Sequence, residues 1–509
     1  MSHPSPDPLH AALLQQAVAH HRAGRFAAAQ GLYRQLLARD PDNADIRHNL
    51  GAALAQQGKL SEAVPHLLAA LEKRPDQPRY WNVASQVLRA MGDREGLEAL
   101  YRKMVALQPD SAAAHFNLGN VLKELGRLNE AEAEWGAALK HKPDFAQAHN
   151  NLGNLAKLRG DLAAAATHYR AATKASPDLA QAHFNFGNVL EQTGKLSEAE
   201  ASYRRVLSLE PDHPDAGRYL GGVLCELGRT GTALEIFMAH AHRRYDAGPS
   251  SGPAPAHKVR HDSEQRAWLK DESLDIEKLR IEGGERLAGA AVNPKSDAPA
   301  IMAAWKTGAP QLVVIDDLLT APALEAMRRY CLGSTIWRQS FPDGYVGALP
   351  EHGFAAPLLA QIGEELASVY PAIFAGHPLL QLWAFKYDSD LKGIKLHADF
   401  AAVNVNFWIT PDDANLDPEH GGLVVWDKAA PLEWDFKKYN NDEPAMRDFL
   451  RTSGAQAITV PYRANRAVVF DSDLFHETDV IRFRQGYENR RINVTMLYGW
   501  RMSKRTAGG

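Results

Sequence analysis

A histidine and an aspartate two positions apart, His397 and Asp399, lie upstream of a third polar residue, His476, and of Arg491. Two imidazoles and one carboxylate on one side of a metal form the ligand set by which non-haem Fe(II) keeps three coordination sites open. An arginine can hold a carboxylate through two parallel hydrogen bonds and stays charged when it is buried. These four residues could therefore hold one iron and one dicarboxylic acid together.

Extended segments are needed to position these side chains. In an extended His-x-Asp, both side chains point to the same face and can approach one metal. Alternation in the run after Arg491 places Arg491, Asn493 and Thr495 on one face and apolar residues on the other. Further strands are expected at 311–315, 380–387, 403–409, 423–426 and 466–470, with 471–475 as the turn that presents His476.

A His-x-Asp triplet is weak evidence by itself, because the chain has 21 histidines and about one such triplet is expected by chance. A second triplet, His213-Pro214-Asp215, falls in a predicted loop between helices. The triplet at His397 differs in its surroundings, since a strand that ends in Tyr387 precedes it and a strand carrying Asn404 and Asn406 on one face follows it. We therefore expect His397 to belong to the metal site.

The order of strands and residues over about 310–500 resembles the Fe(II)- and 2-oxoglutarate-dependent oxygenases. The core of that superfamily is a double-stranded β-helix of the jelly-roll type. The resemblance implies that His397, Asp399 and His476 bind Fe(II). It also implies that 2-oxoglutarate and O2 are cosubstrates and that the chain is a dioxygenase.

For the cosubstrate, the resemblance implies that Arg491 holds the far carboxylate of 2-oxoglutarate, with Tyr387 beside it. Asn404 and Asn406 are expected to line the same cavity or to face solvent. Many members of the superfamily have Arg-x-Ser where this chain has Arg491-Ile492-Asn493, and Arg490 is adjacent. Either arginine could serve, although the alternation favours Arg491.

Two interpretations of these residues involve no oxygenase. The polar residues could stand on an ordinary β-sandwich and be satisfied by local hydrogen bonds. A cupin-like shell could also bind a metal for another purpose, because one architecture hosts many functions. Both alternatives stay open at this point.

The first half of the chain carries a regular repeat. Six prolines recur at one interval, since 75 minus 41 is 34 and each later difference is the same: Pro41, Pro75, Pro109, Pro143, Pro177 and Pro211. That interval is the period of tetratricopeptide repeats. Small residues recur at two positions of the repeat. The first position has Gly51, Gly119, Gly153, Gly187 and Gly221, with Ser85 in one repeat. The second position has Ala29, Ala63, Ala131, Ala165, Ala199 and Ala233, with Leu97 as the exception. Large residues follow the second series: Tyr33, Leu67, Tyr101, Trp135, Tyr169, Tyr203 and Phe237. We predict small-against-large packing of helix pairs in a solenoid of about seven repeats.

Asparagines recur at two positions of the repeat, three residues apart: Asn49, Asn117, Asn151 and Asn185 at the first, and Asn120, Asn154 and Asn188 at the second. Because positions three apart share one helix face, a ladder of amides is expected along a groove. An amide both donates and accepts, so the ladder could bind the backbone of an extended peptide. The array resembles the asparagine-lined superhelix of protein O-GlcNAc transferases, which implies a protein or peptide partner. The alternative is that these amides bond only to neighbouring helices or water.

The expected fold is multidomain, an all-α solenoid followed by a double-stranded β-helix (jelly-roll) domain with flanking helices. We assign residues 9–245 to the solenoid, 246–257 to a proline- and glycine-rich linker and 258–509 to the second domain. Helical segments are expected at about 258–281, and Thr320 is expected to cap another helix that ends near Leu332.

Overall composition narrows the classes of partner and location. The net charge of −4 provides no general basic field, which weighs against nucleic acid as a partner. The two cysteines cannot form a disulfide framework. We expect no membrane association and a cytoplasmic location, because no long apolar run and no signal-peptide pattern occurs.

The leading hypothesis is a 2-oxoglutarate-dependent dioxygenase that hydroxylates a protein or peptide recruited by the solenoid. One alternative keeps the oxygenase but gives it a small-molecule substrate, with the repeats used for assembly. Another is a repeat adaptor without catalytic activity. Hydroxylation and demethylation both agree with the chemistry.

Overall fold

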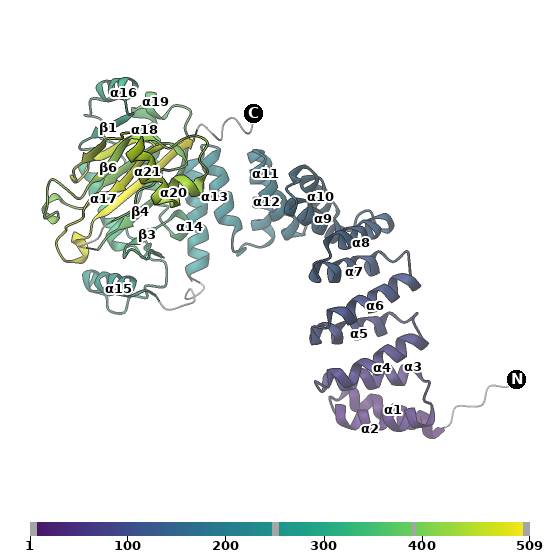
Figure 1. Ribbon diagram of the computed structural model, residues 1–509. Coiled ribbons are helices and arrows are strands. Elements are labelled where there is room, and N and C mark those ends of the chain that lie inside the picture. Colours follow the sequence, from purple (N-terminus) through teal and green to yellow (C-terminus); the bar gives the residue numbers. More distant parts are fainter. Residues whose placement is uncertain (1–7, 247–253, 389–392, 502–509) are drawn as a thin grey trace. The chain divides into compact units, whose positions relative to one another are not determined.

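The computed structural model describes residues 8–246, 254–388 and 393–501 (Figure 1). The chain forms two compact units, Met1–Ala182 and His183–Gly509. The first unit is helical. The second unit contains the last helices of the repeat array together with both β-sheets.

Helix pairs fill the first unit: α1 Pro8–Arg22, α2 Phe26–Arg39, α3 Ala44–Gln56, α4 Leu60–Lys73, α5 Pro78–Met91, α6 Arg94–Leu107, α7 Ala112–Glu124, α8 Leu128–His141, α9 Ala146–Leu158, α10 Leu162–Ala175 and the beginning of α11 Ala180–Gln192. The repeating prolines lie in the turns between pairs, where no helical N–H is required. Several helices begin at a side chain that accepts a backbone N–H, such as Asn43 before α3 and Ser111 before α7.

Helices within a pair approach closely at the small residues. A Cβ added to Gly119 would lie 2.6 Å from the Trp135 ring, and one added to Gly153 would lie 2.6 Å from the Tyr169 ring. The alanine series is fully buried: Ala29, Ala63, Ala131, Ala165, Ala199 and Ala233. The predicted small-against-large packing is therefore confirmed.

A second glycine series, which the sequence analysis missed, occupies the turn inside each helix pair. These residues have φ between +70° and +81°: Gly24, Gly58, Gly92, Gly126, Gly160, Gly194 and Gly228. Glycine adopts this left-handed conformation without the steric penalty of a Cβ. The series has the same interval as the prolines and could have been found from it.

The second unit begins within α11 and contains further helices: α12 Leu196–Leu209, α13 Ala216–Glu226, α14 Thr230–Asp246, α15 Ala256–Leu269, α16 Ala298–Thr307, α17 Ala321–Gly333, α18 Pro357–Val369, α19 Pro371–Phe374, α20 Phe436–Asn441 and α21 Glu443–Thr452, with short 3-10 helices at Pro350–His352, Asp412–Ala414 and Tyr487–Asn489. Helix α14 packs against α18, and α13 packs against strand β4. The last helix pair thus contacts the β-containing part directly.

Among the described residues, ten strands form two antiparallel sheets: β1 Leu312–Ile315, β2 Gln339–Ser340, β3 Val346–Ala348, β4 Leu379–Lys386, β5 Ala401–Trp408, β6 Leu423–Ala429, β7 Ala457–Val460, β8 Ala467–Asp471, β9 Leu474–Thr478 and β10 Ile492–Trp500. The larger sheet has the order β1-β8-β5-β10-β4-β3-β2, and the smaller has the order β7-β6-β9. Phe470 of the larger sheet shares one hydrophobic cluster with Val425 and Leu474 of the smaller sheet. The two sheets therefore pack against each other around a common core.

Two expectations about helices of the second unit need correction. Of the range 258–281, in which helical segments were expected, only the part up to Leu269 is helical, and Lys270 ends α15 in a left-handed conformation with φ of 53°. Beyond it, the side chains of Asp271 and Asp275 accept backbone N–H groups two residues ahead, and such local bonds compete with helix formation. Thr320 does precede α17, but its hydroxyl donates to the Ala290 carbonyl and does not cap the helix.

Most of the predicted linker, residues 247–253, lies outside the described residues. The domain boundaries assigned from the sequence stay a prediction. Helix α15 begins at Ala256, within the predicted linker range. The predicted strand at 311–315 corresponds to β1.

Candidate metal centre and its cavity

Backbone pairing brings His397 and His476 together. Each donates its N–H to the carbonyl of the other, at 3.0 and 2.8 Å, as an isolated antiparallel bridge. His476 lies inside β9, which pairs with β6 of the smaller sheet. The turn expected at 471–475 was therefore too long, because pairing with β6 extends Leu474–Thr478 into a strand.

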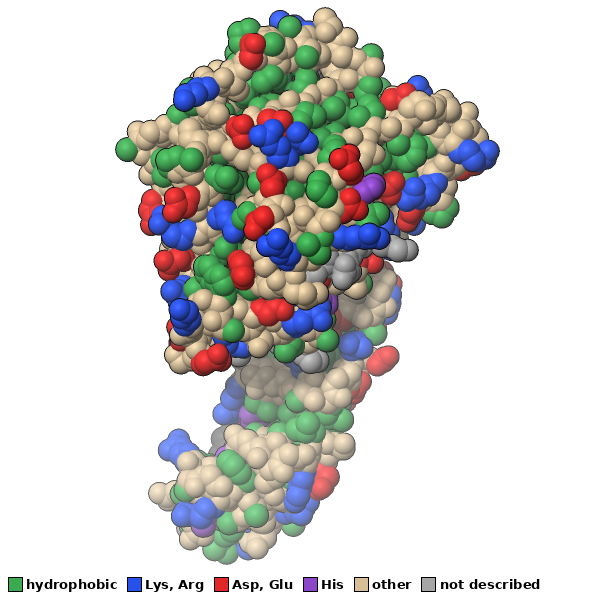
Figure 2. Space-filling model, turned by 90° about the vertical axis from the view of Figure 1, so that its left-hand side faces the viewer, with side chains coloured by type: hydrophobic (Ala, Val, Ile, Leu, Met, Phe, Trp, Pro, Cys, Tyr) green, Lys and Arg blue, Asp and Glu red, His purple; other side chains and the backbone are tan. Residues whose placement is uncertain are grey.

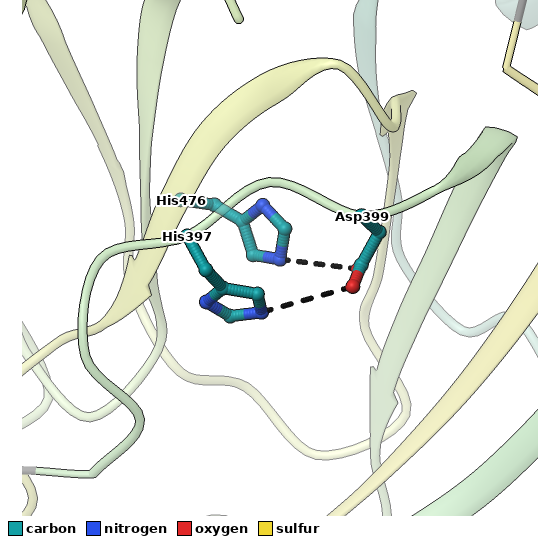
Figure 3. Close-up of side chains that lie close together, drawn as sticks. All are labelled: His397, Asp399 and His476. Carbon is teal, nitrogen blue, oxygen red and sulfur yellow. Dashed lines mark ion pairs between the residues drawn. The ribbon is translucent and has the colours of Figure 1, made fainter. Parts of the chain in front are cut away.

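The three predicted ligands converge (Figure 3). His397 Nε2 lies 3.9 Å from Asp399 Oδ1, and His476 Nε2 lies 3.5 Å from Asp399 Oδ2. One ligand atom from each residue lies within 4.8 Å of the others, and this is the one such grouping found in the part of the chain that the structure describes. The competing triplet at His213 lies in the loop between α12 and α13, where its ring Nδ1 accepts backbone N–H groups.

The hydrogen bonds of the two rings define which nitrogen is available. His397 Nδ1 lies 2.8 Å from the Lys395 carbonyl, and His476 Nδ1 lies 3.0 Å from the Leu474 carbonyl. A carbonyl oxygen only accepts, so each Nδ1 carries the hydrogen and each Nε2 keeps its lone pair. Metal-binding histidines are commonly oriented in this way by a bond from the other ring nitrogen.

The protonation states of the site agree with metal binding. Burial, followed by the neighbouring His476 ring, lowers the pKa of His397 to about 4. Burial tends to raise the pKa of Asp399, but its contacts with His476, His397 and Asn404 hold that pKa below the usual value. At neutral pH the site contains a neutral His397 imidazole and an Asp399 carboxylate, which are the forms that bind a metal.

A chain of buried side chains holds the carboxylate. Asn404 Nδ2 donates to Asp399 Oδ2 at 2.6 Å, and Asn406 Nδ2 donates to Asn404 Oδ1 at 2.6 Å. Asn406 Oδ1 accepts in turn from Asn493 Nδ2 and Thr495 Oγ1, both at 2.8 Å. These bonds cross from β5 to β10, where Asn406 pairs with Thr495. Asp399 Oδ1 is left to approach a metal.

Arg491 is a buried cation that forms no ion pair with any residue that the structure describes. It is 1% exposed, and its Nε and Nη2 donate to the carbonyls of Gly421 and Gly422 at 2.7 and 3.1 Å. Within the described residues, neither Arg491 Nη1 nor the hydroxyl of Tyr387 has a hydrogen-bond partner. The Arg491 guanidinium lies 5.0 Å from the centre of the Tyr387 ring. The two groups can therefore still bond to an anion.

Arg490 is engaged elsewhere. Its Nε donates to Glu264 at 2.8 Å, and its Nη2 lies 3.5 Å from Asp388. It does not line the cavity that contains Arg491. As the alternation of β10 predicts, Arg491 is the arginine that faces the three converging side chains.

A cavity of about 560 Å³, which we call the metal cavity, contains the predicted site: His397, Asp399, His476, Arg491, Tyr387, Asn404 and Asn406 all line it. Asn404 and Asn406 are thus turned inward and not toward solvent. Its volume is in the range of small-molecule sites.

Several residues that line the metal cavity were not foreseen. Asn440, Asn441, Glu443 and Met446 reach it from α20 and α21, which lie between β6 and β7. The Asn440 side chain donates to the Ala398 carbonyl at 3.0 Å, next to the metal ligands. This helical insertion has no motif that marks it, and only its position between two strands could have suggested a role.

A buried metal with an anionic cosubstrate would fit these residues. Two Nε2 lone pairs and one carboxylate oxygen face a common point, which suits Fe(II). Arg491 Nη1 and the Tyr387 hydroxyl lack partners in the described structure and lie in the same cavity. A dicarboxylate with one end at the metal and the other at Arg491 would satisfy both groups.

The asparagines of the repeats divide into two kinds. At the second position, the side-chain oxygens accept from the aromatic residue of the paired helix, at 3.2 Å for Asn120 from Trp135 and at 2.7 Å for Asn154 from Tyr169. Asn188 accepts in the same way from Tyr203 at 2.7 Å. The side-chain oxygens at this position therefore bond to aromatic residues of the same repeat. This agrees with the alternative that the amides bond to neighbouring helices.

At the first position, Asn151 Nδ2 donates to Asn120 Oδ1 at 2.8 Å, so one repeat is linked to the next. Asn49, Asn117 and Asn185 are half-buried. A groove of about 450 Å³ in the first unit is lined by Asn120 and Asn151 among other polar residues. We call it the amide groove.

Surface charge is mixed on the face of the molecule seen in Figure 2. Among the side chains coloured there, acidic and basic groups are interspersed, and neither sign forms one broad patch. This agrees with the small net charge of −4. In the portions of the chain that the structure describes, every helix is too short or too polar to span a membrane.

Comparisons with known proteins concern the repeats. The tetratricopeptide-repeat family matches residues 20–87, 100–133, 118–180 and 180–213. Protein FlbA of Caulobacter vibrioides is 34% identical over 77 residues, which make up 15% of this chain and 13% of FlbA. The chain therefore matches only a small part of that relative.

Solved structures with likeness to this chain are also repeat proteins. A tetratricopeptide repeat protein from Parabacteroides merdae has a TM-score of 0.34 at 17% identity, over 45% of this chain and 90% of its own. YrrB, described as a tetratricopeptide-repeat protein with an unusual peptide-binding site, has a TM-score of 0.30 at 19% identity. The likeness covers 36% of this chain and 95% of the YrrB chain. MamA of Desulfovibrio magneticus has a TM-score of 0.29 at 19% identity. The likeness covers 34% of this chain and 99% of the MamA chain.

The interval of the prolines, the helix pairs and the family matches agree with one another. The part of the chain up to about residue 213 is built from tetratricopeptide repeats.

Proposed function

We propose that the part of the chain assigned to the second domain, residues 258–509, is an Fe(II)- and 2-oxoglutarate-dependent dioxygenase that hydroxylates a protein or peptide recruited by the repeats. In this proposal, the two antiparallel sheets are the halves of a double-stranded β-helix. The observation that carries it is the convergence of His397, Asp399 and His476 in a cavity that also contains Arg491, whose Nη1 has no hydrogen-bond partner among the described residues.

The metal ligands are prepared for binding. Both imidazoles direct Nε2 inward because Nδ1 is held by a carbonyl, and the amide of Asn404 holds one oxygen of Asp399. Three protein ligands would leave three coordination positions for a bidentate cosubstrate and O2. A cupin-like metal shell without oxygenase activity would not require an additional buried arginine with an unsatisfied donor.

The position of Arg491 supports a dicarboxylate cosubstrate. Its two glycine carbonyl partners fix the orientation of the guanidinium, and Nη1 remains for the ligand. Tyr387 would add a second hydrogen bond to the same carboxylate. Such charge-assisted bonds are strong in a buried site.

When bound, iron and 2-oxoglutarate supply the oxidising chemistry, in which O2 and 2-oxoglutarate give succinate, CO2 and one oxygen atom inserted into a C–H bond of the substrate. The residues of the chain bind and orient these molecules. The apolar walls around Phe385 and Leu423 limit the access of water to the site. Asn440 and Glu443 line the same cavity from α20 and α21.

The repeats support a polypeptide substrate over a small molecule. The amide groove in the first unit has donors and acceptors that suit an extended backbone. Repeat solenoids present long concave surfaces of this kind. We place the partner's contacts at the first asparagine position, since the oxygens of the second are occupied by aromatic residues of the repeats.

The test is succinate formation from 2-oxoglutarate by the purified chain with Fe(II) in air. We expect succinate with the natural sequence and none above background with His397→Ala or Asp399→Ala. Equal succinate formation by the natural chain and both variants would contradict the assignment.

A second candidate is an adaptor without catalytic activity, which the repeats favour because they match a family of repeat proteins on their own. An adaptor would have no use for the convergence of three metal ligands. Absence of succinate formation by a chain shown to contain Fe(II) would favour the adaptor.

A further inference from the structure

Ala398 lies between two of the three metal ligands, and both of its backbone polar groups bond to helix α20. Its N–H donates to the Tyr439 carbonyl at 2.9 Å, and its carbonyl accepts from Asn440 Nδ2 at 3.0 Å. Ala398 is 0% exposed, so neither group is open to bulk solvent. The two ligands are therefore joined through a residue whose backbone is held by α20.

The residues on either side of Ala398 bond in the opposite direction. His397 exchanges both backbone bonds with His476, and the Asp399 N–H donates to the Ser472 carbonyl at 3.1 Å. In an extended backbone, the polar groups of successive residues point to opposite sides. The segment that carries the ligands is thus held between β9 with its preceding turn on one side and α20 on the other.

Helix α20 is itself anchored in the core. Tyr439 is 4% exposed and belongs to one hydrophobic cluster with Leu396 and Phe475. The Arg501 guanidinium lies 4.4 Å from the centre of the Tyr439 ring. Asn440 therefore extends its amide from a backbone that is fixed by the preceding residue.

The Asn440 amide can face Ala398 in one orientation only. A carbonyl oxygen accepts and does not donate, so the amide nitrogen must point to it. The side chain is half-buried and lines the metal cavity. Among the described residues, no other donor bonds to the Ala398 carbonyl. The position of this carbonyl therefore depends on Asn440.

Asn440 and Asn404 act on different parts of the ligand segment. Asn404 bonds to the carboxylate of Asp399, whereas Asn440 bonds to the peptide group that precedes Asp399. Leaving a buried carbonyl without a donor costs free energy, which a rotation of the peptide group toward another donor would relieve. Because the peptide group is planar, this rotation would also move the nitrogen and Cα of Asp399.

We propose that Asn440 is a positioning residue of the metal centre, which sets the geometry of the ligands by holding the peptide group between Ala398 and Asp399. This inference rests on the metal site of the proposed function. It makes the helical insertion between β6 and β7 a part of the metal centre in addition to a wall of the cavity.

The probes are Co(II) and Fe(II), each bound to the full chain. The visible absorption bands of Co(II) report the number and arrangement of its ligands, and anaerobic calorimetry measures the affinity for Fe(II). Asn440→Leu removes the donor and keeps about the size of the side chain, whereas Asn440→Ala removes both. In both variants we expect altered Co(II) bands and a dissociation constant for Fe(II) that is about tenfold higher.

Asn293→Ala is the matched control. The Asn293 side chain also donates to a backbone carbonyl at 3.0 Å, that of Asp317, but it does not line the metal cavity. We expect this variant to keep the Co(II) bands and the Fe(II) affinity of the natural chain. Thermal unfolding without metal verifies that each variant is folded.

A purely structural role of Asn440 gives a different result. Folded Asn440 variants that lose thermal stability but keep the natural Co(II) bands and Fe(II) affinity would overturn the inference. A change of the same size in Asn293→Ala would also overturn it, because the effect would then not come from the ligand segment.

Failure of this inference can be separated from failure of the proposed function. If the natural chain forms succinate and the Asn440 variants keep its metal properties, the inference is wrong and the oxygenase stands. If the natural chain binds Fe(II) without forming succinate, the oxygenase is wrong, and altered Co(II) bands in the Asn440 variants would still support the inference. A natural chain that binds no Fe(II) would refute both.

Discussion

The side-chain amides of the repeats and those of the metal cavity are held by different kinds of contact. In the repeats, Asn120, Asn154 and Asn188 each accept from an aromatic side chain 15 positions later, and the same bond recurs from one repeat to the next. In the metal cavity, Asn406 accepts from residues 87 and 89 positions later, and this bond occurs once.

This difference has consequences for how each region responds to change. A local bond that recurs can be lost at one repeat while its neighbours keep their packing. A set of single long-range bonds around one carboxylate has no substitute, and its members act together. We therefore expect mutations in the cavity to affect binding sharply and mutations in the repeats to affect stability gradually.

The largest effect is expected from Asp399→Ala, which removes one of three metal ligands. We expect the dissociation constant for Fe(II) to rise by at least about 100-fold, more than the loss of an outer partner typically causes. Anaerobic isothermal titration calorimetry measures it. Asp215→Ala is the matched control, because it alters the other His-x-Asp and should leave Fe(II) affinity unchanged; a similar loss in both variants would contradict the site.

Arg491→Gln should weaken the binding of 2-oxoglutarate by about 100-fold, the scale of removing one partner of a buried ion pair. The readout is the dependence of succinate formation on 2-oxoglutarate concentration. Arg490→Gln breaks the pair with Glu264 and should lower thermal stability without this change. If Arg490→Gln gave the larger loss of affinity, the assignment of the two arginines would be reversed.

Asn404→Ala should weaken Fe(II) binding by about 10-fold, because Asp399 loses the amide that orients it but remains a ligand. Calorimetry under the same conditions as for Asp399→Ala provides the comparison. An effect as large as that of Asp399→Ala would mean that Asn404 does more than orient the carboxylate.

In the repeats, Gly153→Ala should lower the free energy of unfolding by about 1–3 kcal/mol, because its Cβ would lie 2.6 Å from the Tyr169 ring. Urea denaturation followed by circular dichroism measures the change. Gly136→Ala is the control within α8, where nothing lies within 4 Å of an added Cβ, and it should stabilise the helix by about 0.5–1 kcal/mol. Equal effects of the two substitutions would refute the close-packing explanation.

The repeat region was predictable because its contacts are local and recur. The interval of the prolines and the small-to-large pairs predict the helix packing, and the close approach of Gly119 to Trp135 follows that rule. The role of the second asparagine position was less clear from the sequence. Its oxygen could have faced a peptide or a neighbouring helix, and only the geometry of Trp135 and Tyr169 distinguishes the two.

In the second unit, the alternation of residues within one strand predicts which side chains face the cavity. The sequence does not predict how the strands pair with one another. The spacing along β10 correctly placed Arg491, Asn493 and Thr495 toward the cavity. The bond chain from Asp399 through Asn404 and Asn406 depends on the register of β5 against β10, which no local pattern specifies. The range 258–281, where helical segments were expected, is not helical after Leu269, because the side chains of Asp271 and Asp275 accept the N–H groups of Ser273 and Glu277.

The most direct test of the metal centre is an anaerobic crystal structure of the chain with Fe(II) and an unreactive 2-oxoglutarate analogue. We expect iron bonded to Nε2 of His397, Nε2 of His476 and one oxygen of Asp399, with the far carboxylate of the analogue on Arg491 and Tyr387. Iron bound at other residues, or an analogue whose far carboxylate lies away from Arg491, would contradict the proposed dioxygenase site.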